Sequence, residues 1–432
     1  MYDTSDNYKA KIYNTPHSLK VFINDSEIDK KYILSCKVEQ QLFSNDEFSL
    51  GSITAKSAEL KLYKTAVPET INKVEIKSGI IGEIIPVGIF NVDDISKDDD
   101  YTITLKLLDN MIKFEFNYDG SKLTYPATLL TVLQDICSKA GVNFGSTSFL
   151  NCNKEIAVYD NTVSARTYVS YIAESAGGFA YIGRDGKLYI KTIGETTATL
   201  PIKYFQKFKW GEKIKITRVS YEDGIQSFKN GDTTGNTIHI SQDNMFIVDQ
   251  QQIDNIYNQI NGLEVYSFEG DSIIDPAWDI GDLLIIDNKK VIFQGSADFG
   301  GKWKASINSK IQCKAKEETM VKTPSQAKIN RRFESKINQA EGKITQLTNQ
   351  TTEHETKLSQ QEQDIESIKS QVENTAEYKR EKSGFTEIHI EDAGQADILK
   401  LEIQGNKTYE ANLFPRATLY PRVGLQPNQK GG

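Results

Sequence analysis

Few residues of this chain are of the kind that build a covalent framework or a metal site. Its 432 residues include only four cysteines and four histidines. The cysteines are widely scattered, with no CxxC pair and no histidine at metal-ligand spacing, so we expect neither a disulfide framework nor a zinc site. We expect core or incidental thiols instead. The cysteines are Cys36, Cys137, Cys152 and Cys313.

Long apolar runs and an excess of positive charge are also lacking. The most apolar stretch, residues 79–90, is interrupted by Glu83 and Pro86 and is far shorter than the ~20 residues that span a bilayer. Residues 1–14 lack the pattern of a secretory signal. The 51 Lys+Arg and 59 Asp+Glu residues give a formal net charge of −8, which argues against nonspecific electrostatic binding to DNA or to an anionic membrane. We therefore expect no nucleic-acid specificity, no membrane insertion, and folding in the cytoplasm.

No catalytic constellation can be assembled from the sequence. The histidines, His17, His239, His354 and His389, lie in four different segments, and none has a cysteine or serine beside it in a nucleophile motif. The acidic run at 93–100 lacks the spacing and central glycine of a calcium loop, so we expect a solvated loop between strands. We predict no enzyme, no cofactor and no metal. A cysteine–histidine hydrolase stays open, because its residues meet only in a fold.

The first 322 residues have a mainly β pattern that is interrupted once. Residues 18–116 alternate apolar and polar side chains with turn residues between the runs, which predicts a small barrel or sandwich. A similar pattern returns at residues 201–321, with one helix whose apolar stripe ends at Gly262. We expect two small β-barrel-like domains, at residues 1–117 and 201–322.

The interruption, residues 118–200, predicts an α/β domain. Pro126 suits the first position of a helix whose apolar face ends at Gly141. A second helix is expected from Ser164 to the glycine pair at 177–178. Two strands follow around an Asp-Gly pair at 185–186, which is a strong hairpin signal.

A heptad repeat begins after Pro324, in a segment nearly free of glycine and proline until Gly384. The unbroken 3–4 spacing predicts a coiled-coil stalk over residues 323–382, followed by a short C-terminal β segment at 383–432. The a and d positions predicted to associate the chains are Phe333, Ile337, Ala340, Ile344, Leu347, Thr351, His354, Leu358, Gln361, Ile365, Ile368 and Val372.

The alternative to a coiled coil is one amphipathic helix lying on a globular domain. The stripe is narrow and strictly seven-periodic, and three flanking residue pairs five apart have opposite charges, which favours parallel, in-register helices. Ile365 and Ile368 as adjacent a and d residues favour three strands over two. Thr351, His354 and Gln361 place polar layers in the middle of the stalk, which weaken it or fix its register.

Two stretches resemble baseplate hub and tail-associated proteins of phages and prophages of Gram-positive bacteria. The first comprises LLTVLQDIC at 129–137, RTYVSYIAESAGGFA at 166–180 and RDGKL at 184–188. The second comprises DPAWDIGDLLIID at 275–287 and FGG at 299–301. Both have structural roles without any ligand: helices, a glycine cap and a hairpin in the first, and a tight turn into a strand in the second.

The resemblance implies a structural tail-tip protein. It implies a homotrimeric hub with two similar β-barrel domains per chain, which would match a sixfold tail tube and a threefold tip. Its expected partners are a distal tail or tube protein, the tape-measure protein and a receptor-binding protein, in a particle assembled in the bacterial cytoplasm. Residues 383–432 look like the opening of a C-terminal β module of such proteins. Two alternatives stay open: a tail-associated peptidoglycan hydrolase, and a trimeric surface adhesin.

Overall fold

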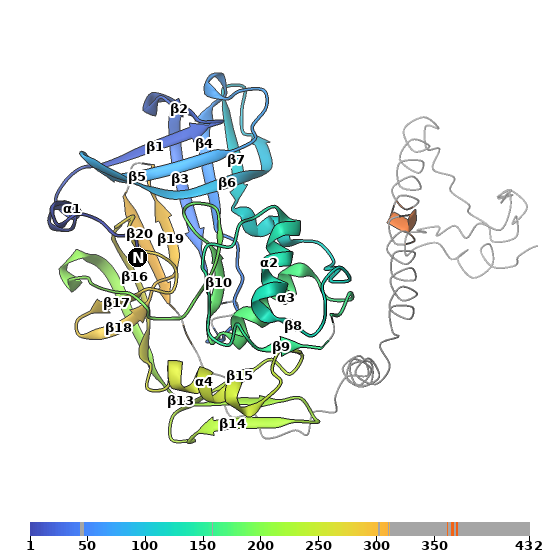
Figure 1. Ribbon diagram of the computed structural model, residues 1–432. Coiled ribbons are helices and arrows are strands. Elements are labelled where there is room, and N and C mark those ends of the chain that lie inside the picture. Colours follow the sequence, from blue (N-terminus) through green and yellow to red (C-terminus); the bar gives the residue numbers. More distant parts are fainter. Residues whose placement is uncertain are drawn as a thin grey trace, which may run out of the picture. The chain divides into compact units, whose positions relative to one another are not determined.

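The computed structural model describes residues 1–43, 47–157, 159–300, 303–309, 311, 361, 364–366 and 369. The chain divides into two compact units, Met1–Thr352 and Glu353–Gly432. The described part of the first unit is mainly β, as the sequence predicts (Figure 1). In the second unit, the described residues are helical and exposed.

The elements of the first unit follow the predicted order of β, α/β and β segments. The first β segment contains α1 Asp6–Lys11, β1 His17–Ile23, β2 Ser26–Ile28, β3 Ile33–Gln40, β4 Ser57–Tyr63, β5 Val74–Ile80, β6 Glu83–Lys97 and β7 Thr102–Leu108. The middle segment contains β8 Ala127–Thr128, α2 Leu129–Ala140, β9 Glu155–Ile156, α3 Ala165–Ser175, β10 Phe179–Ile182, β11 Leu188–Lys191 and β12 Thr197–Thr199. The last segment contains β13 Phe205–Glu222, β14 Ser227–Gly231, β15 Asn236–Ile240, α4 Gln250–Ile260, β16 Glu264–Ile273, β17 Leu283–Ile286, β18 Lys289–Ile292, β19 Gly295–Asp298 and β20 Lys304–Ser309.

One sheet of 13 strands joins the first and last segments. Its order is β14-β13-β16-β20-β19-β3-β4-β7-β6-β5-β1-β2, with β15 also paired to β13. The two segments meet where β19 pairs antiparallel with β3, from Gly295 opposite Gln40 to Asp298 opposite Lys37. One apolar cluster contains residues of both segments, while the middle segment contributes most of another cluster. The predicted domain boundaries and barrels stay predictions.

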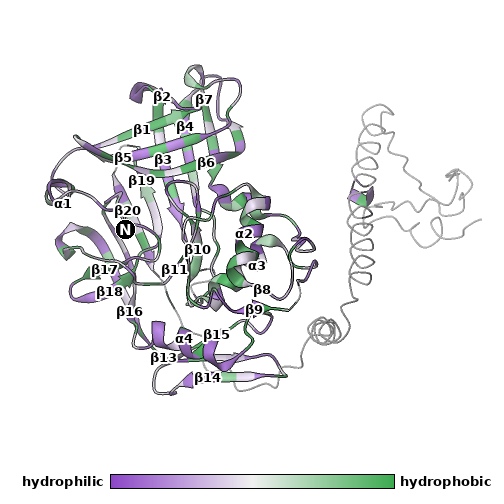
Figure 2. Ribbon diagram, in the orientation of Figure 1, coloured by the Kyte–Doolittle hydropathy of each residue, from purple (hydrophilic) through white to green (hydrophobic). Residues whose placement is uncertain are grey.

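The strands form where the sequence alternates. In β4, Ala58, Leu60 and Leu62 are buried while the residues between them are partly or fully exposed, and Figure 2 shows the corresponding changes of hydropathy along the strands. The turn between β1 and β2 uses Asn24 and Asp25, which both have positive φ angles and belong to the residue types that tolerate this conformation.

The helices of the middle segment form as predicted, apart from one boundary. The Ser164 side chain accepts the hydrogen bond from Thr167 N at the start of α3, and Gly177 follows its end with φ of 66°. The prediction that Pro126 starts the preceding helix was wrong. Thr128, in extended conformation, is the N-cap of α2, because residues 127–128 pair with β9 before the helix begins.

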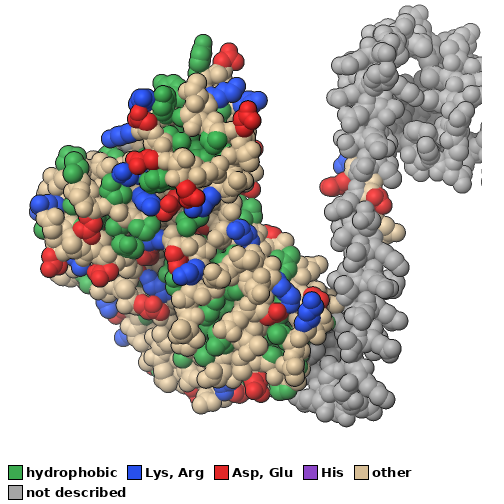
Figure 3. Space-filling view, turned by 45° about the horizontal axis from the view of Figure 1, so that its top comes forward, with side chains coloured by type: hydrophobic (Ala, Val, Ile, Leu, Met, Phe, Trp, Pro, Cys, Tyr) green, Lys and Arg blue, Asp and Glu red, His purple; other side chains and the backbone are tan. Residues whose placement is uncertain are grey.

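The described residues contain no helix that is long and apolar enough to cross a membrane. On the face shown in Figure 3, lysine and arginine side chains are interspersed with aspartate and glutamate side chains. This mixture agrees with the near balance of positive and negative residues in the sequence.

Candidate functional site

Most of the residues predicted to associate the chains lie outside the described residues. Of the predicted a and d positions, the structure describes Gln361 and Ile365. Both are helical, and Ile365 is 62% exposed. Association of the chains through this stripe stays a prediction.

A buried ionic junction is the most elaborate polar feature of the first unit. It consists of Lys56, Arg184, Lys191, Asp279, Asp282 and the Met1 amine. These groups come from all three segments of the sequence. Burial of so many charges is tolerated only where each charge is paired or hydrogen-bonded.

Lys56 and Arg184 of the junction donate hydrogen bonds to backbone carbonyls at a bulge in β6. Val87 has no partner in β5, because the register shifts between the Ile76–Gly88 and Lys77–Pro86 pairs. The Arg184 guanidinium donates a hydrogen bond to the Pro86 carbonyl at 2.6 Å, and the Lys56 ammonium donates one to the Val87 carbonyl at 3.0 Å. The two cations thus satisfy carbonyls at the irregular point of the ladder.

Arg184 also joins the two motifs on which the resemblance rests. It lies in the turn between β10 and β11, and its Nε is 2.8 Å from Asp279 Oδ1. Its Nη2 donates to the Trp278 carbonyl at 3.0 Å. The RDGKL and DPAWDIGD motifs, 95 residues apart in the chain, therefore meet in one buried contact.

Asp282 forms the other half of the junction. Its side chain is fully buried, and its Oδ1 accepts hydrogen bonds from Lys191 Nζ at 2.6 Å and from the Met1 amine at 2.9 Å. Its Oδ1 also accepts from the Thr196 hydroxyl, and its Oδ2 accepts from Asp279 N at 2.8 Å. Asp282 therefore accepts four hydrogen bonds within the junction.

The protonation of the junction follows from this arrangement. Burial raises the pKa of Asp279, but Arg184, the Met1 amine and two lysines outweigh burial and hold this pKa below its usual value. Burial and the nearby Arg184 charge lower the pKa of Lys56 to about 8. Burial raises the pKa of Asp109, beside the Lys56 backbone, to about 6. Folding thus disfavours the charged form of Lys56.

The N-terminal segment is fixed beside the junction by a second buried contact. The Tyr8 hydroxyl of α1 donates to Asp275 Oδ1 at 3.0 Å, and the same oxygen accepts from Ala277 N at 2.9 Å. Burial raises the pKa of Asp275 despite these donors and the nearby Arg184. The DPAW turn is therefore held from both sides, by α1 and by the β10–β11 hairpin.

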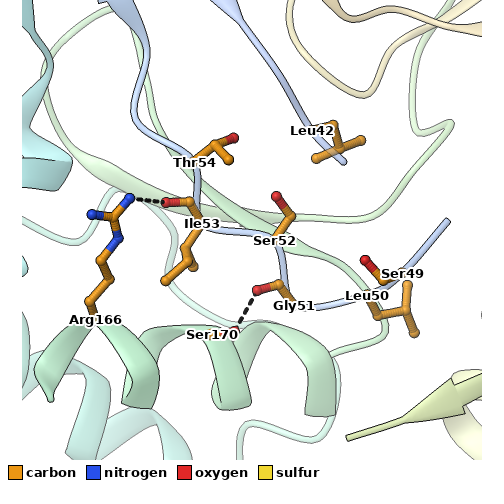
Figure 4. A pocket seen from close by; sticks show the side chains of 9 residues that line it. All are labelled: Leu42, Ser49, Leu50, Gly51, Ser52, Ile53, Thr54, Arg166 and Ser170. Carbon is orange, nitrogen blue, oxygen red and sulfur yellow. Dashed lines mark hydrogen bonds between the residues drawn. The ribbon is translucent and has the colours of Figure 1, made fainter. Parts of the chain in front are cut away.

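An open cleft of about 290 Å³ lies between α3 and residues 49–54 (Figure 4). Ser170 Oγ donates to the Gly51 carbonyl at 2.7 Å, and Arg166 Nη2 donates to the Ile53 carbonyl at 3.2 Å. Arg166 also pairs with Glu115. Arg166 and Ser170 of α3 thus hold residues 49–54 of the same chain in place by hydrogen bonds to their backbone. The volume of the cleft is at the lower end of the range of small-molecule sites.

Sequence reasoning missed one pair with possible nucleophile chemistry. Ser220 Oγ lies 2.8 Å from His239 Nδ1, and the two residues are direct partners across the β13–β15 ladder. Neither lies in a nucleophile motif, so no local signal predicts the pair. A serine beside a histidine is the beginning of a hydrolytic site, but a polar pair at opposite ladder positions also stabilises a sheet.

Three of the four cysteines and the whole acidic run lie within the described residues. Cys36, Cys137 and Cys152 are buried free thiols, as expected, and burial raises the pKa of Cys36 and of Cys137 to about 12. Cys313 lies outside the described residues. The prediction of a loop for the acidic run is right for Asp98, Asp99 and Asp100, which lie in the exposed connection from β6 to β7. It was wrong for Asp93 and Asp94, because β6 extends to Lys97 and its ladder with β7 includes Asp94. Within the described residues, no group of three or more histidine, cysteine or acidic side chains is arranged to hold a metal.

Neither a protein-family model nor a curated protein sequence matches this chain. Solved structures that align with it include the 43 kDa tail protein of prophage MuSo2 from Shewanella oneidensis, 13% identical over 68% of this chain and 96% of that chain, with a TM-score of 0.45. A tail protein from Neisseria meningitidis is 10% identical over 68% of this chain and 96% of that chain, with a TM-score of 0.43. Prophage tail protein gp18 from Listeria monocytogenes is 12% identical over 73% of this chain and 99% of that chain, with a TM-score of 0.42.

Proposed function

We propose that this chain is a structural hub of a phage-type tail, a homotrimer that closes the tail tube and positions a receptor-binding protein. The observation that carries the proposal is the Arg184–Asp279 contact at 2.8 Å. It joins the two motifs by which the sequence resembles tail proteins into one buried unit.

The ionic junction supports a role in which the first unit holds its partner proteins in fixed positions. It ties the N-terminus, the β10–β11 hairpin and the DPAWDIGD turn together by several charge-assisted hydrogen bonds, and the β3–β19 pair ties the two β segments by backbone hydrogen bonds. Such a unit is suited to hold tube-side partners, the distal tail protein and the tape-measure protein, in fixed positions. The predicted stalk would carry the receptor-binding side.

The experiment is to locate the protein in particles. Tails purified from a producing bacterium would be labelled with an antibody against the first unit and viewed by electron microscopy. We expect label at the tail tip and three copies per particle. Absence from the particles, or label along the tube, would contradict the proposal.

The Ser220–His239 pair favours a second candidate, a tail-associated peptidoglycan hydrolase. We propose that the chain is not an enzyme and expect no clearing of a cell-wall gel by the pure protein. Clearing that is lost in Ser220→Ala, and retained in the control Ser227→Ala on the neighbouring strand β14, would establish the hydrolase instead.

A further inference from the structure

The first half of β13 is exposed to an unusual degree for a strand. Seven of the eight residues 206–213 are exposed, and Trp210 is partly buried. A strand that lies on a core buries every second side chain, whereas residues 206–213 include no fully buried side chain. One face of this stretch contacts the core only through the Phe208 and Trp210 rings, which pack on Phe268. Among the described residues, its ladder partner is β16, while β14 and β15 pair only with the second half of β13, from Ile216 onward.

The exposed stretch is basic and aromatic. Residues 206–215, called here the basic edge, contain four lysines and one glutamate. Within the described part of the chain, Lys207, Lys209 and Lys215 make no ion pair, whereas Lys213 pairs with Glu264 at 2.9 Å. Phe208 between the lysines is 49% exposed.

A second surface has the opposite charge. Residues 93–101, called here the acidic tip, contain five aspartates and one lysine. Asp94 and Asp98 pair with lysines of the neighbouring strands, while Asp93 and Asp100 make no ion pair within the described residues. Tyr101 is 76% exposed and Ile95 is 48% exposed. The acidic tip therefore combines free negative charge with apolar surface, as the basic edge combines apolar surface with free positive charge.

The two surfaces lie on separate strands of one chain. In the sheet order, five strands lie between β13, whose first half carries the basic edge, and β7, and the acidic tip lies at the end of β6 and in the loop that leads to β7. A second copy can bring them into contact. Because the two patches differ, the contact is head-to-tail and closes into a ring when the rotation between copies is one third of a turn.

We propose that the basic edge of one copy docks on the acidic tip of the next copy, so that three copies form a closed ring. The proposal rests on the trimer of the proposed function and adds the surface by which the first units meet. Complementary charges set the partner and the register of such a contact, and the exposed aromatic and aliphatic side chains supply buried apolar area.

The competing explanation is that the lysines only protect a free strand edge against pairing with other chains. A cross-linking experiment on the full chain separates the two. In the double variant Lys209→Cys with Asp100→Cys, we expect disulfide-linked dimers and trimers under mild oxidation. Each single variant, and the control Lys209→Cys with Glu155→Cys, should stay monomeric on a non-reducing gel.

Charge exchange tests the specificity of the contact. Lys207→Glu added to the double cysteine variant should lower the cross-linked fraction up to about fivefold, the size expected for an exposed pair. Asp93→Lys added to that protein should restore it. Cross-links in Lys209→Cys alone would show edge-to-edge pairing and overturn the proposal.

Sedimentation of the same samples distinguishes a failure of the docking contact from a failure of the proposed trimer. Trimers without cross-links in the double cysteine variant would overturn the docking contact and leave the proposed trimer intact. Monomers without cross-links would overturn both.

Discussion

The two units of this chain differ in the exposure of the apolar residues that the structure describes. Ile76 in the large sheet is fully buried by its own chain, whereas Ile365 in the predicted stalk is 62% exposed. Ile365 is helical and occupies an a position of an unbroken heptad repeat. An isoleucine repeated at such positions is covered when further chains supply the missing surface.

The difference separates two sources of stability. The first unit is held by contacts within the chain, including the ionic junction and the β3–β19 pair, so its unfolding is expected to be independent of concentration. The predicted stalk would be stabilised by association, so its helical structure is expected to depend on concentration. Variants in one unit should therefore leave the other unit unchanged, and the four predictions below test this separation.

The largest effect is expected in the stalk. Changing Ile365 and Ile368 together to Asp would place six carboxylates on the axis of a trimer, where burial of charge is costly. We expect the trimer dissociation constant to rise on the order of a thousandfold or more, measured by sedimentation. The control Ser367→Asp with Ser370→Asp adds the same charge at outer positions. If the two variants behave alike, the predicted heptad register is wrong.

The second effect is expected in the junction. Arg184→Met leaves Asp279 buried with less compensation, and we expect a loss of about 3–5 kcal/mol in the free energy of unfolding of the first unit, with unchanged association of the chains. Guanidinium unfolding measures the loss. Lys187→Met, in the same turn but at an exposed ion pair with Asp185, should leave the free energy of unfolding nearly unchanged. Equal effects of the two variants would show that the junction adds nothing to an ordinary surface pair.

The third effect concerns the pH dependence of the first unit. The pKa of Lys56 falls from 10.5 to about 8 in the fold, so folding favours its neutral form. The stability that it contributes is present above the unfolded pKa and is lost as pH falls through about 8. Between about pH 8 and 9.5 the free energy of unfolding should rise with pH, by on the order of 1 kcal/mol or more.

Lys56→Met should remove this contribution, so the difference between wild type and variant should itself change with pH across that window. Denaturant unfolding at a series of pH values gives the slope. The exposed Lys113→Met should keep the slope of the wild type. A parallel pH dependence in wild type and Lys56→Met would show that Lys56 keeps an ordinary pKa.

The smallest effect is expected at the middle of the stalk. Three His354 side chains would meet near the axis of a parallel trimer, and their protonation would bring like charges together, so stability should fall as pH drops through about 6.5. His354→Leu should raise the melting temperature of the stalk by several degrees and flatten its dependence on pH between about 5 and 7. Identical melting of a stalk peptide at both pH values, with no gain from leucine, would place His354 away from the axis.

Local features of the fold could be predicted from the sequence because short-range chemistry decides them. Ser164 caps α3, the Asp-Gly pair at 185–186 turns the β10–β11 hairpin, and the stripe before Gly262 forms α4, with Ile253, Ile256 and Ile260 buried. Each of these signals lies within a dozen residues, where periodicity and turn chemistry act directly.

The long-range contacts could not be predicted in the same way. The β3–β19 pair joins strands more than 250 residues apart. Alternation of apolar and polar residues predicts which face of a strand is buried, but it does not predict which other strand pairs with it. The Arg184–Asp279 contact spans 95 residues, and its two motifs each had a sufficient local role in a turn. The Ser220–His239 pair depends on the parallel register of β13 and β15, which no local pattern specifies.

Sedimentation equilibrium of the full-length wild-type chain tests the central claim most directly, because a threefold hub requires three copies. The account predicts a particle of three times the 48.6 kDa chain mass at micromolar concentration. A species of one or two chain masses that stays unchanged as the concentration rises would contradict it.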